Sequence, residues 1–248
     1  RTWALLAWRD IDMRYRRSLI GPFWVSISMG VMVLSLAFLY GGMFGKGQSD
    51  YSAYLSYLAC GFLAWGLLSG LVSEACNCVV ESEGYLRNVP MPLTLIACRT
   101  VFRQLVYFAH NLLVIVPLVF FLGVGLKLTI FEAVLGVGIY VAAGIGACLT
   151  RGPLCARFRD LPQVVANVMQ ALFFFTPVFW TRDAVSAQRE MLVDANPFYH
   201  FVQLIRGPIL GEEFSEISLV YTLGCVITLW VIGIGVFLWS RRQLYFWL

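Results

Sequence analysis

Side chains of the types that carry out catalysis are few in this sequence, and their spacing does not assemble a reactive centre. The two histidines, His110 and His200, have no carboxylate at a spacing that would place it beside them. Catalysis needs a nucleophile, a paired acid and base, or a metal ion, with these groups within reach of one another. We therefore expect no catalytic residue, and we expect His110 to hydrogen-bond across helices.

Two short motifs could bind a metal ion or a phosphate, but both are incomplete. Cys76 and Cys78 form a CxC pair, and no further pair of His or Cys lies nearby to complete a zinc site. Residues 41–47, GGMFGKG, are one residue short of a phosphate-binding loop, and neither Ser nor Thr follows Lys46. The sequence predicts no metal site, nucleotide site or other cofactor site in this chain.

Arginine is concentrated in the segment WRDIDMRYRRSLIGPFW, residues 8–24, directly before a long uncharged stretch. On a helical wheel the apolar residues share a narrow arc and the charged residues point the opposite way. The apolar arc holds Ala4, Trp8, Ile11 and Tyr15, and the charged face holds Arg9, Asp12, Arg16 and Arg17. This pattern predicts an amphipathic interface helix over residues 1–21, with a plain positively charged anchor as the alternative.

The elements that position these residues are predicted to be membrane-spanning helices, because 60% of the residues are hydrophobic and only 13% are charged. A helix needs roughly 20 apolar residues to cross the hydrocarbon core. Six stretches without Asp, Glu, Lys or Arg qualify: residues 22–44, 54–73, 105–125, 133–150, 161–181 and 217–240. They are apolar on every side, unlike the strands of a β-barrel. The predicted fold class is all-α, with a single transmembrane domain over residues 1–248.

Basic residues divide unequally between the two sides of such a bundle. Of the 18 Lys and Arg residues, 13 fall on the side of the N-terminus and five on the other side. Because cytoplasmic segments carry the excess, both termini are predicted to be cytoplasmic. The net charge of +4 then reflects topology and contact with membrane lipids, and no nucleic-acid partner is predicted.

Two loops on the cytoplasmic side could dock a soluble partner. In residues 81–99, a short helix would expose Glu83, Tyr85 and Arg87 before Pro90 stops it. Residues 151–162 form a second basic loop that also ends in proline. The alternative for both loops is a plain connection between spans.

The outer segment, residues 182–216, contains a part that is too apolar for a free loop and too short to cross the bilayer twice. In residues 196–213, the turn at Asn196-Pro197 and the break at Gly207-Pro208 predict two short re-entrant helices. The alternative is an amphipathic helix that lies flat on the outer surface.

Aromatic residues crowd the preceding stretch LFFFTPVFW, residues 172–180. They could form an ordinary interfacial belt, or they could stack on the apolar faces of sugar rings. Asn167 and Gln170 could bond between helices or line a polar pore. No span holds an ionised residue for a proton or sodium relay, so a separate ATPase is the expected energy source.

Four segments together resemble the membrane subunits of type-2 ABC exporters of bacterial polysaccharides, such as O-antigen, capsule and wall teichoic acid. The resemblance covers nearly the whole chain, and the last segment is most similar to the O-antigen branch. The segments are WRDIDMRYRRSLIGPFW, EGYLRNVPMPL, RDLPQVVANVMQALFFFTPVFW and NPFYHFVQLIRGPILG. The resemblance implies a homodimer in the bacterial inner membrane that works with two nucleotide-binding ATPase subunits, which hold ATP and Mg. The implied substrate is a glycan on undecaprenyl diphosphate.

Carried onto this chain, the resemblance implies four groups of site residues. The ATPase-coupling residues would be Glu83, Tyr85, Arg87, Arg157 and Asp160, and the channel or sugar contacts Phe174, Phe175, Phe179 and Trp180. The outer gate would be Asn196, Pro197, Phe198, Tyr199, His200 and Phe201, and the cytoplasmic entrance Arg14, Arg16 and Arg17. Two alternatives remain: an exporter of another lipid or a drug, and a membrane-embedded transferase that uses His110.

Overall fold

The computed structural model describes residues 2–16, 18–21, 23–44, 48–88, 91–122, 129–182 and 187–247, and every regular element in these ranges is a helix. The α-helices are α1 (Thr2–Tyr15), α2 (Phe23–Phe44), α3 (Gln48–Asn77), α4 (Glu83–Asn88), α5 (Leu93–Asn111), α6 (Ile115–Leu122), α7 (Ile130–Arg157), α8 (Leu161–Phe175), α9 (Ala187–Asp194), α10 (Pro197–Leu210), α11 (Glu216–Ser240) and α12 (Leu244–Trp247). Two 3-10 turns, Val80–Ser82 and Leu112–Val114, connect neighbouring helices. The all-α prediction is confirmed.

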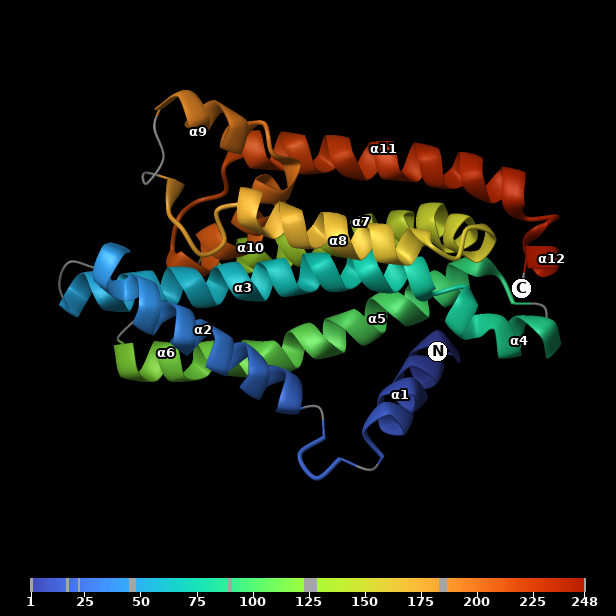
Figure 1. Ribbon diagram of the computed structural model, residues 1–248, viewed down its shortest axis with the longest axis horizontal. Coiled ribbons are helices and arrows are strands. Elements are labelled where there is room, and N and C mark those ends of the chain that lie inside the picture. The colour runs from blue at the N-terminus through green and yellow to red at the C-terminus, as the bar shows by residue number, and fades with distance from the viewer. Residues whose placement is uncertain are drawn as a thin grey trace.

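The long helices lie side by side, and Figure 1 shows α4, α12 and the C-terminus at one end of the bundle and α9 at the other. We call these the α4 end and the α9 end. Five helical segments are long and apolar enough to cross a membrane: Phe23–Gly42, Tyr51–Asn77, Leu93–Leu118, Phe131–Arg157 and Glu216–Ser240. They correspond to five of the six predicted spans.

The remaining predicted span, residues 161–181, forms only the 15-residue helix α8. At about 1.5 Å per residue, α8 is roughly 22 Å long, which is shorter than the hydrocarbon core of about 30 Å. The helix stops because Thr176 precedes Pro177 and adopts an extended conformation, with ψ of 133°. The six-span prediction therefore reduces to five helices of spanning length among the described residues.

The interior of the bundle is built by α3, α7 and α10. Tyr140 of α7 is fully buried, and its hydroxyl donates to the carbonyl of Phe201 in α10 at 2.9 Å. Trp230 of α11 donates from its ring nitrogen to the carbonyl of Ala142 in α7 at 2.9 Å. Polar groups inside an apolar bundle need such partners, and these bonds fix how the helices sit against one another.

Residues 196–213 form one helix where two were predicted. Asn196 caps α10 by accepting from the backbone N–H of Phe198 at 2.9 Å, and Pro197 occupies the first helical position. The helix continues through Pro208 and ends at Gly211, whose φ of 86° favours glycine. The predicted division at Gly207-Pro208 is therefore wrong. The flat surface helix does not fit either, because α10 packs against α3, α7 and α11 and most of its residues are buried.

Candidate functional site

Charged side chains at the α4 end join α1 to α3 and α5. Arg99 donates two hydrogen bonds of 2.6 Å to the two carboxylate oxygens of Asp10. Arg103 donates to Asp10 at 3.4 Å and to Glu81 at 2.9 Å, and it also pairs with Glu74. The side chains of Asp10, Arg99 and Arg103 are each less than one tenth exposed. We call these five residues the buried ion cluster.

The buried ion cluster was not predicted, because the third span was expected to start after Arg103. In the structure α5 begins at Leu93, so Arg99 and Arg103 lie within the helical segment that is long enough to cross a membrane. Their spacing of four residues shows that they share a helix face. Their partner Asp10 is 89 residues away from Arg99 in the sequence, and no sequence pattern connects the two.

Helix α1 packs on α5 with a face that largely overlaps the predicted apolar arc, because Ile11 is buried and Ala4 and Tyr15 are half-buried. Ala7 and Ile11 are buried beside the charged Asp10, whereas Trp8 is 55% exposed. Arg14 donates to the hydroxyl of Tyr107 at 3.0 Å. Burial by itself disfavours the Arg14 cation, but this bond and the nearby Glu74 carboxylate raise the pKa of Arg14 above its ordinary value, so the side chain stays charged. The amphipathic helix is thus attached to the bundle by charge as well as by apolar contact.

Of the other two predicted entrance residues, the structure describes only Arg16. Arg16 is exposed at the end of α1, and Arg17 lies outside the described residues. Beyond them Gly21 takes a φ of 61°, which favours glycine and turns the chain toward α2.

Helix α4 carries three of the predicted coupling residues and contacts the buried ion cluster. Glu83 and Arg87 form an ion pair of 2.7 Å on its exposed side. The ring of Tyr85 lies 4.9 Å from the guanidinium of Arg99, which is the residue that holds Asp10. A displacement of α4 would therefore reach α1 through two side chains.

The two other predicted coupling residues lie where α7 gives way to α8. The Arg157 guanidinium lies 5.1 to 5.3 Å from the ring centroids of Phe158, Trp239 and Trp247, so it fastens the C-terminal residues to α7. Asp160 is exposed directly before α8. Arg157 has a visible packing role, and Asp160 remains available to a partner.

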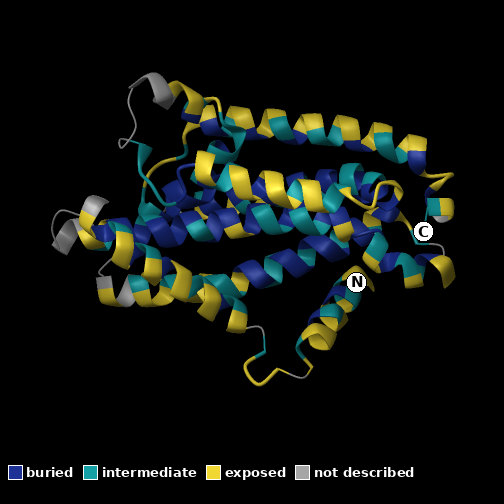
Figure 2. Cartoon of the chain, in the orientation of Figure 1, coloured by how far each residue is buried: buried dark blue, intermediate teal, exposed yellow. Residues whose placement is uncertain are grey.

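The side of α8 that faces away from the core carries a row of polar side chains. Gln163, Asn167, Gln170 and Phe174 fall within about 60° of one another around the helix axis and are all exposed. The amide of Gln163 donates to the side-chain oxygen of Asn167 at 3.1 Å. We call these four residues the α8 polar row. Figure 2 shows exposed residues along this helix.

The four predicted sugar contacts lie in residues 174–180, at and after the end of α8, which we call the aromatic turn. They are of two kinds. Phe174 and Phe175 are 60% and 73% exposed, so both are available to a ligand. Phe179 stacks on Phe173 at 5.6 Å, and the ring nitrogen of Trp180 donates to the carbonyl of Phe174 at 3.2 Å. Phe179 and Trp180 therefore hold the shape of the turn.

Hydrogen bonds from three neighbouring side chains fix the same turn. Tyr54 donates to the carbonyl of Phe179 at 2.7 Å, and Tyr57 donates to the carbonyl of Pro177 at 3.1 Å. Arg206 of α10 also donates to Pro177, at 2.6 Å, while its guanidinium lies 4.1 Å from the ring centroid of Tyr57. Arg206 is only 3% exposed. From the sequence, Arg206 was expected only as one of the five basic residues on the outer side, and nothing in its local sequence signalled this buried role.

The predicted gate residues form the N-terminal cap and first turns of α10, which are held in place by hydrogen bonds. The amide nitrogen of Asn196 donates to the hydroxyl of Thr176 at 3.1 Å, so the cap of α10 is tied to the aromatic turn. His200 is buried, with one ring nitrogen 2.9 Å from the Ser218 hydroxyl and the other 2.7 Å from the Asp194 carbonyl. Its ring stacks on Tyr221 at 4.4 Å. The other predicted gate residues differ in burial: Phe201 is buried, while Pro197, Phe198 and Tyr199 are half-buried.

Within the described residues, the side chain of His110 makes no hydrogen bond across helices, unlike the prediction. The ring nitrogen Nδ1 lies 2.8 Å from the carbonyl of Val106, one turn earlier in the same helix. The bond across helices is made by the backbone instead, because Ser26 of α2 donates to the carbonyl of His110 at 2.6 Å.

A helical bundle with several spanning helices, a charged end and a polar row on an exposed helix face fits a membrane transport protein. The chain belongs to the ABC-2 type transporter family, which matches residues 1–210. It is also similar to the O-antigen export system permease protein RfbA of Myxococcus xanthus, with 21% identity over 246 residues that cover 96% of this chain and 91% of that protein.

These matches place the chain among multi-pass membrane proteins and make it a transporter subunit, not an enzyme. They confirm the predicted family and remove the alternative of a transferase that uses His110. Permeases of this family generally pair with ATPase subunits.

Proposed function

We propose that this chain forms, as a homodimer with two ATPase subunits, an exporter of polysaccharide linked to undecaprenyl diphosphate. O-antigen is the proposed cargo, because the similar protein from Myxococcus xanthus carries that name. The dimer lies in the bacterial inner membrane with both termini in the cytoplasm, as the excess of basic residues at the α4 end favours. ATP and Mg are held by the ATPase subunits.

The observation that carries this proposal is the α8 polar row. Three carboxamide side chains are exposed on the outer side of a helix of the membrane bundle, where lipid offers them no hydrogen-bond partner. A second copy of the chain and a polar path between the copies would supply partners. Carboxamides both donate and accept hydrogen bonds, as sugar hydroxyls do. Phe174, at the end of the row, presents a ring face on which any sugar unit of the glycan can stack.

The coupling step is proposed to start at α4. An ATPase subunit that binds Glu83 and Arg87 would move Tyr85 against Arg99, and Arg99 holds α1 through Asp10. Because Tyr85 lies against Arg99 and Arg99 is bonded to Asp10 at 2.6 Å, the displacement passes from α4 to α1. Arg16 at the end of α1 would meet the diphosphate or the anionic headgroups at the entrance.

The test is to deplete the protein from its native host and to purify a tagged copy in mild detergent. We expect loss of a surface glycan and recovery of an ATP-hydrolysing subunit in a one-to-one ratio with the chain. Chemical identification of the missing glycan distinguishes O-antigen from capsule and teichoic acid. An intact set of surface glycans with an associated ATPase would show that the cargo is another lipid or a drug.

A further inference from the structure

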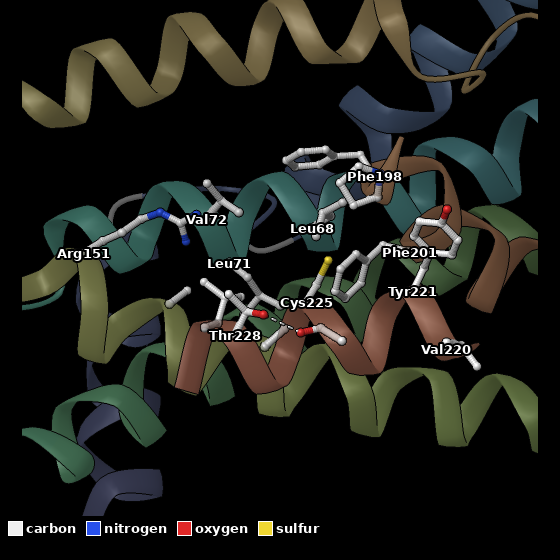
Figure 3. A pocket seen from close by; sticks show the side chains of 16 residues that line it. Leu68, Leu71, Val72, Arg151, Phe198, Phe201, Val220, Tyr221, Cys225 and Thr228 are labelled. Carbon is white, nitrogen blue, oxygen red and sulfur yellow. Dashed lines mark hydrogen bonds between the residues drawn. The ribbon is translucent and has the colours of Figure 1, made fainter. Parts of the chain in front are cut away.

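A cavity of about 520 Å³ lies between α3, α7, α11 and the start of α10, and its lining is almost entirely apolar. Figure 3 shows Arg151 at one end of this cavity and Phe198, Phe201 and Tyr221 at the other. Tyr221 is 44% exposed, so the cavity opens toward the outside of the bundle along α11. No residue of α8 lines it, which separates this groove from the α8 polar row.

Arg151 supplies a charge that the groove does not neutralise. One of its terminal guanidinium nitrogens is buried and has no hydrogen-bond partner in the described part of the chain. The Thr228 hydroxyl, which also lines the groove, already donates to the carbonyl of Gly224 at 2.8 Å. Arg151 is half-buried, and a buried guanidinium nitrogen without a hydrogen-bond partner is costly, so an anionic group beside Arg151 would complete the site.

The length of the groove matches one leaflet of a membrane. The lining residues of α11 run from Val220 to Leu229, which is about 13 Å along the helix and roughly half of the hydrocarbon core. Arg151 directly follows the uncharged stretch 133–150, so it lies near the level where hydrocarbon gives way to headgroups. The side chains of Phe198 and Phe201 occupy the other end.

We infer that this groove binds an anionic phospholipid, with an acyl chain in the cavity and the phosphate beside Arg151. The charge selects an anionic lipid, and the apolar walls select its hydrocarbon chain. The bound lipid fills the space between α3 and α11 and so stabilises the position of α11. The site is distinct from the α8 polar row and from the coupling helix, but Phe198 and Phe201 at its far end are also predicted gate residues.

The experiment is native mass spectrometry of the purified full chain, delipidated and then titrated with phosphatidylglycerol or with zwitterionic phosphatidylcholine. We expect one tightly bound phosphatidylglycerol per chain and weaker binding of phosphatidylcholine. Arg151→Gln should weaken phosphatidylglycerol binding about tenfold or more, because a charge-assisted bond to phosphate is lost. Arg242→Gln, an exposed arginine near the C-terminus, is the matched control and should leave binding unchanged.

A second variant tests the hydrocarbon part of the site without altering charge. A Cβ at Gly224 meets nothing within 4 Å, so Gly224→Leu places a side chain in the groove without a clash. Gly235 is also exposed and open, on the same helix, and it does not line the groove. We expect Gly224→Leu to displace the lipid and Gly235→Leu to retain it.

Three results would overturn the inference. They are equal affinity for the two lipids, unchanged phosphatidylglycerol binding in Gly224→Leu, and a change in dimer mass in Gly224→Leu with no change in bound lipid, which would assign the groove to a second copy. None of these readouts depends on transport, so each outcome is separate from the fate of the export proposal.

Discussion

A buried carboxylate between two guanidinium groups holds the structure together only while all its partners are present. Removing one partner of a buried ion pair leaves an uncompensated charge, at a cost of about 3–5 kcal/mol. Asp10 is the only member of the buried ion cluster that comes from α1, so the attachment of this helix depends on it. The position of α1 in the bundle therefore depends on the single residue Asp10.

The Asp10→Asn variant tests this dependence. We expect the backbone amides of α1 to exchange hydrogen about 100-fold faster or more, because the helix separates from α5 once Arg99 loses its charged partner. Hydrogen exchange followed by mass spectrometry measures this rate. Asp12→Asn removes an exposed charge from the same helix and should change nothing. Equal exchange in Asp10→Asn and the unaltered chain would show that the apolar contacts of Ala7 and Ile11 and the bond from Arg14 to Tyr107 hold α1 without Asp10.

At the scale of elements, composition and proline positions predicted most of the helices. The five spanning helices follow from uncharged stretches, and the short helix α4 follows from the polar segment that ends at Pro90. The failures have physical causes. Thr176-Pro177 ends α8 early, and the surrounding helices α3, α7 and α11 keep α10 continuous across Gly207-Pro208. Tertiary packing overrode the local break signal at Gly207-Pro208 in α10, but not the one at Thr176-Pro177 after α8.

The Arg206→Met variant tests the link between α10 and the aromatic turn. Methionine keeps much of the apolar length but cannot donate to the buried carbonyl of Pro177. We expect the free energy of unfolding to fall by about 1–3 kcal/mol, measured by thermal unfolding in detergent. The exposed Arg242→Met serves as the control. Unchanged stability would mean that Tyr57 alone satisfies this carbonyl.

The Arg87→Glu variant tests the coupling helix. The ion pair with Glu83 is exposed, and such pairs contribute only about 0.3–0.5 kcal/mol, so the fold should persist. Inverting the charge on a contact surface should weaken binding of the ATPase subunit by about tenfold or more, measured as retained subunit in a pull-down at increasing salt. Arg242→Glu makes the same charge change outside α4. Full binding and transport by Arg87→Glu would move the docking surface away from this helix.

For the whole molecule, the sequence predicted a membrane bundle with a charged end and an aromatic turn, but not how these parts meet. Asp10 and Arg206 act through partners far away in the sequence, and only the fold brings them together. The α8 polar row is the reverse case, because Asn167 and Gln170 were visible as polar residues in a span and the structure added that they share an exposed face. The export account depends most on this face.

The most direct test is to replace Gln170 with a photoreactive amino acid and to irradiate cells that are exporting glycan. The account predicts a glycan-bearing adduct that forms at this position only when the ATPase is active. The same replacement at Ile234, which is 47% exposed on α11, should give lipid adducts without glycan. Glycan adducts that are equally frequent at both positions, or absent at Gln170 during active export, would contradict a glycan path along α8.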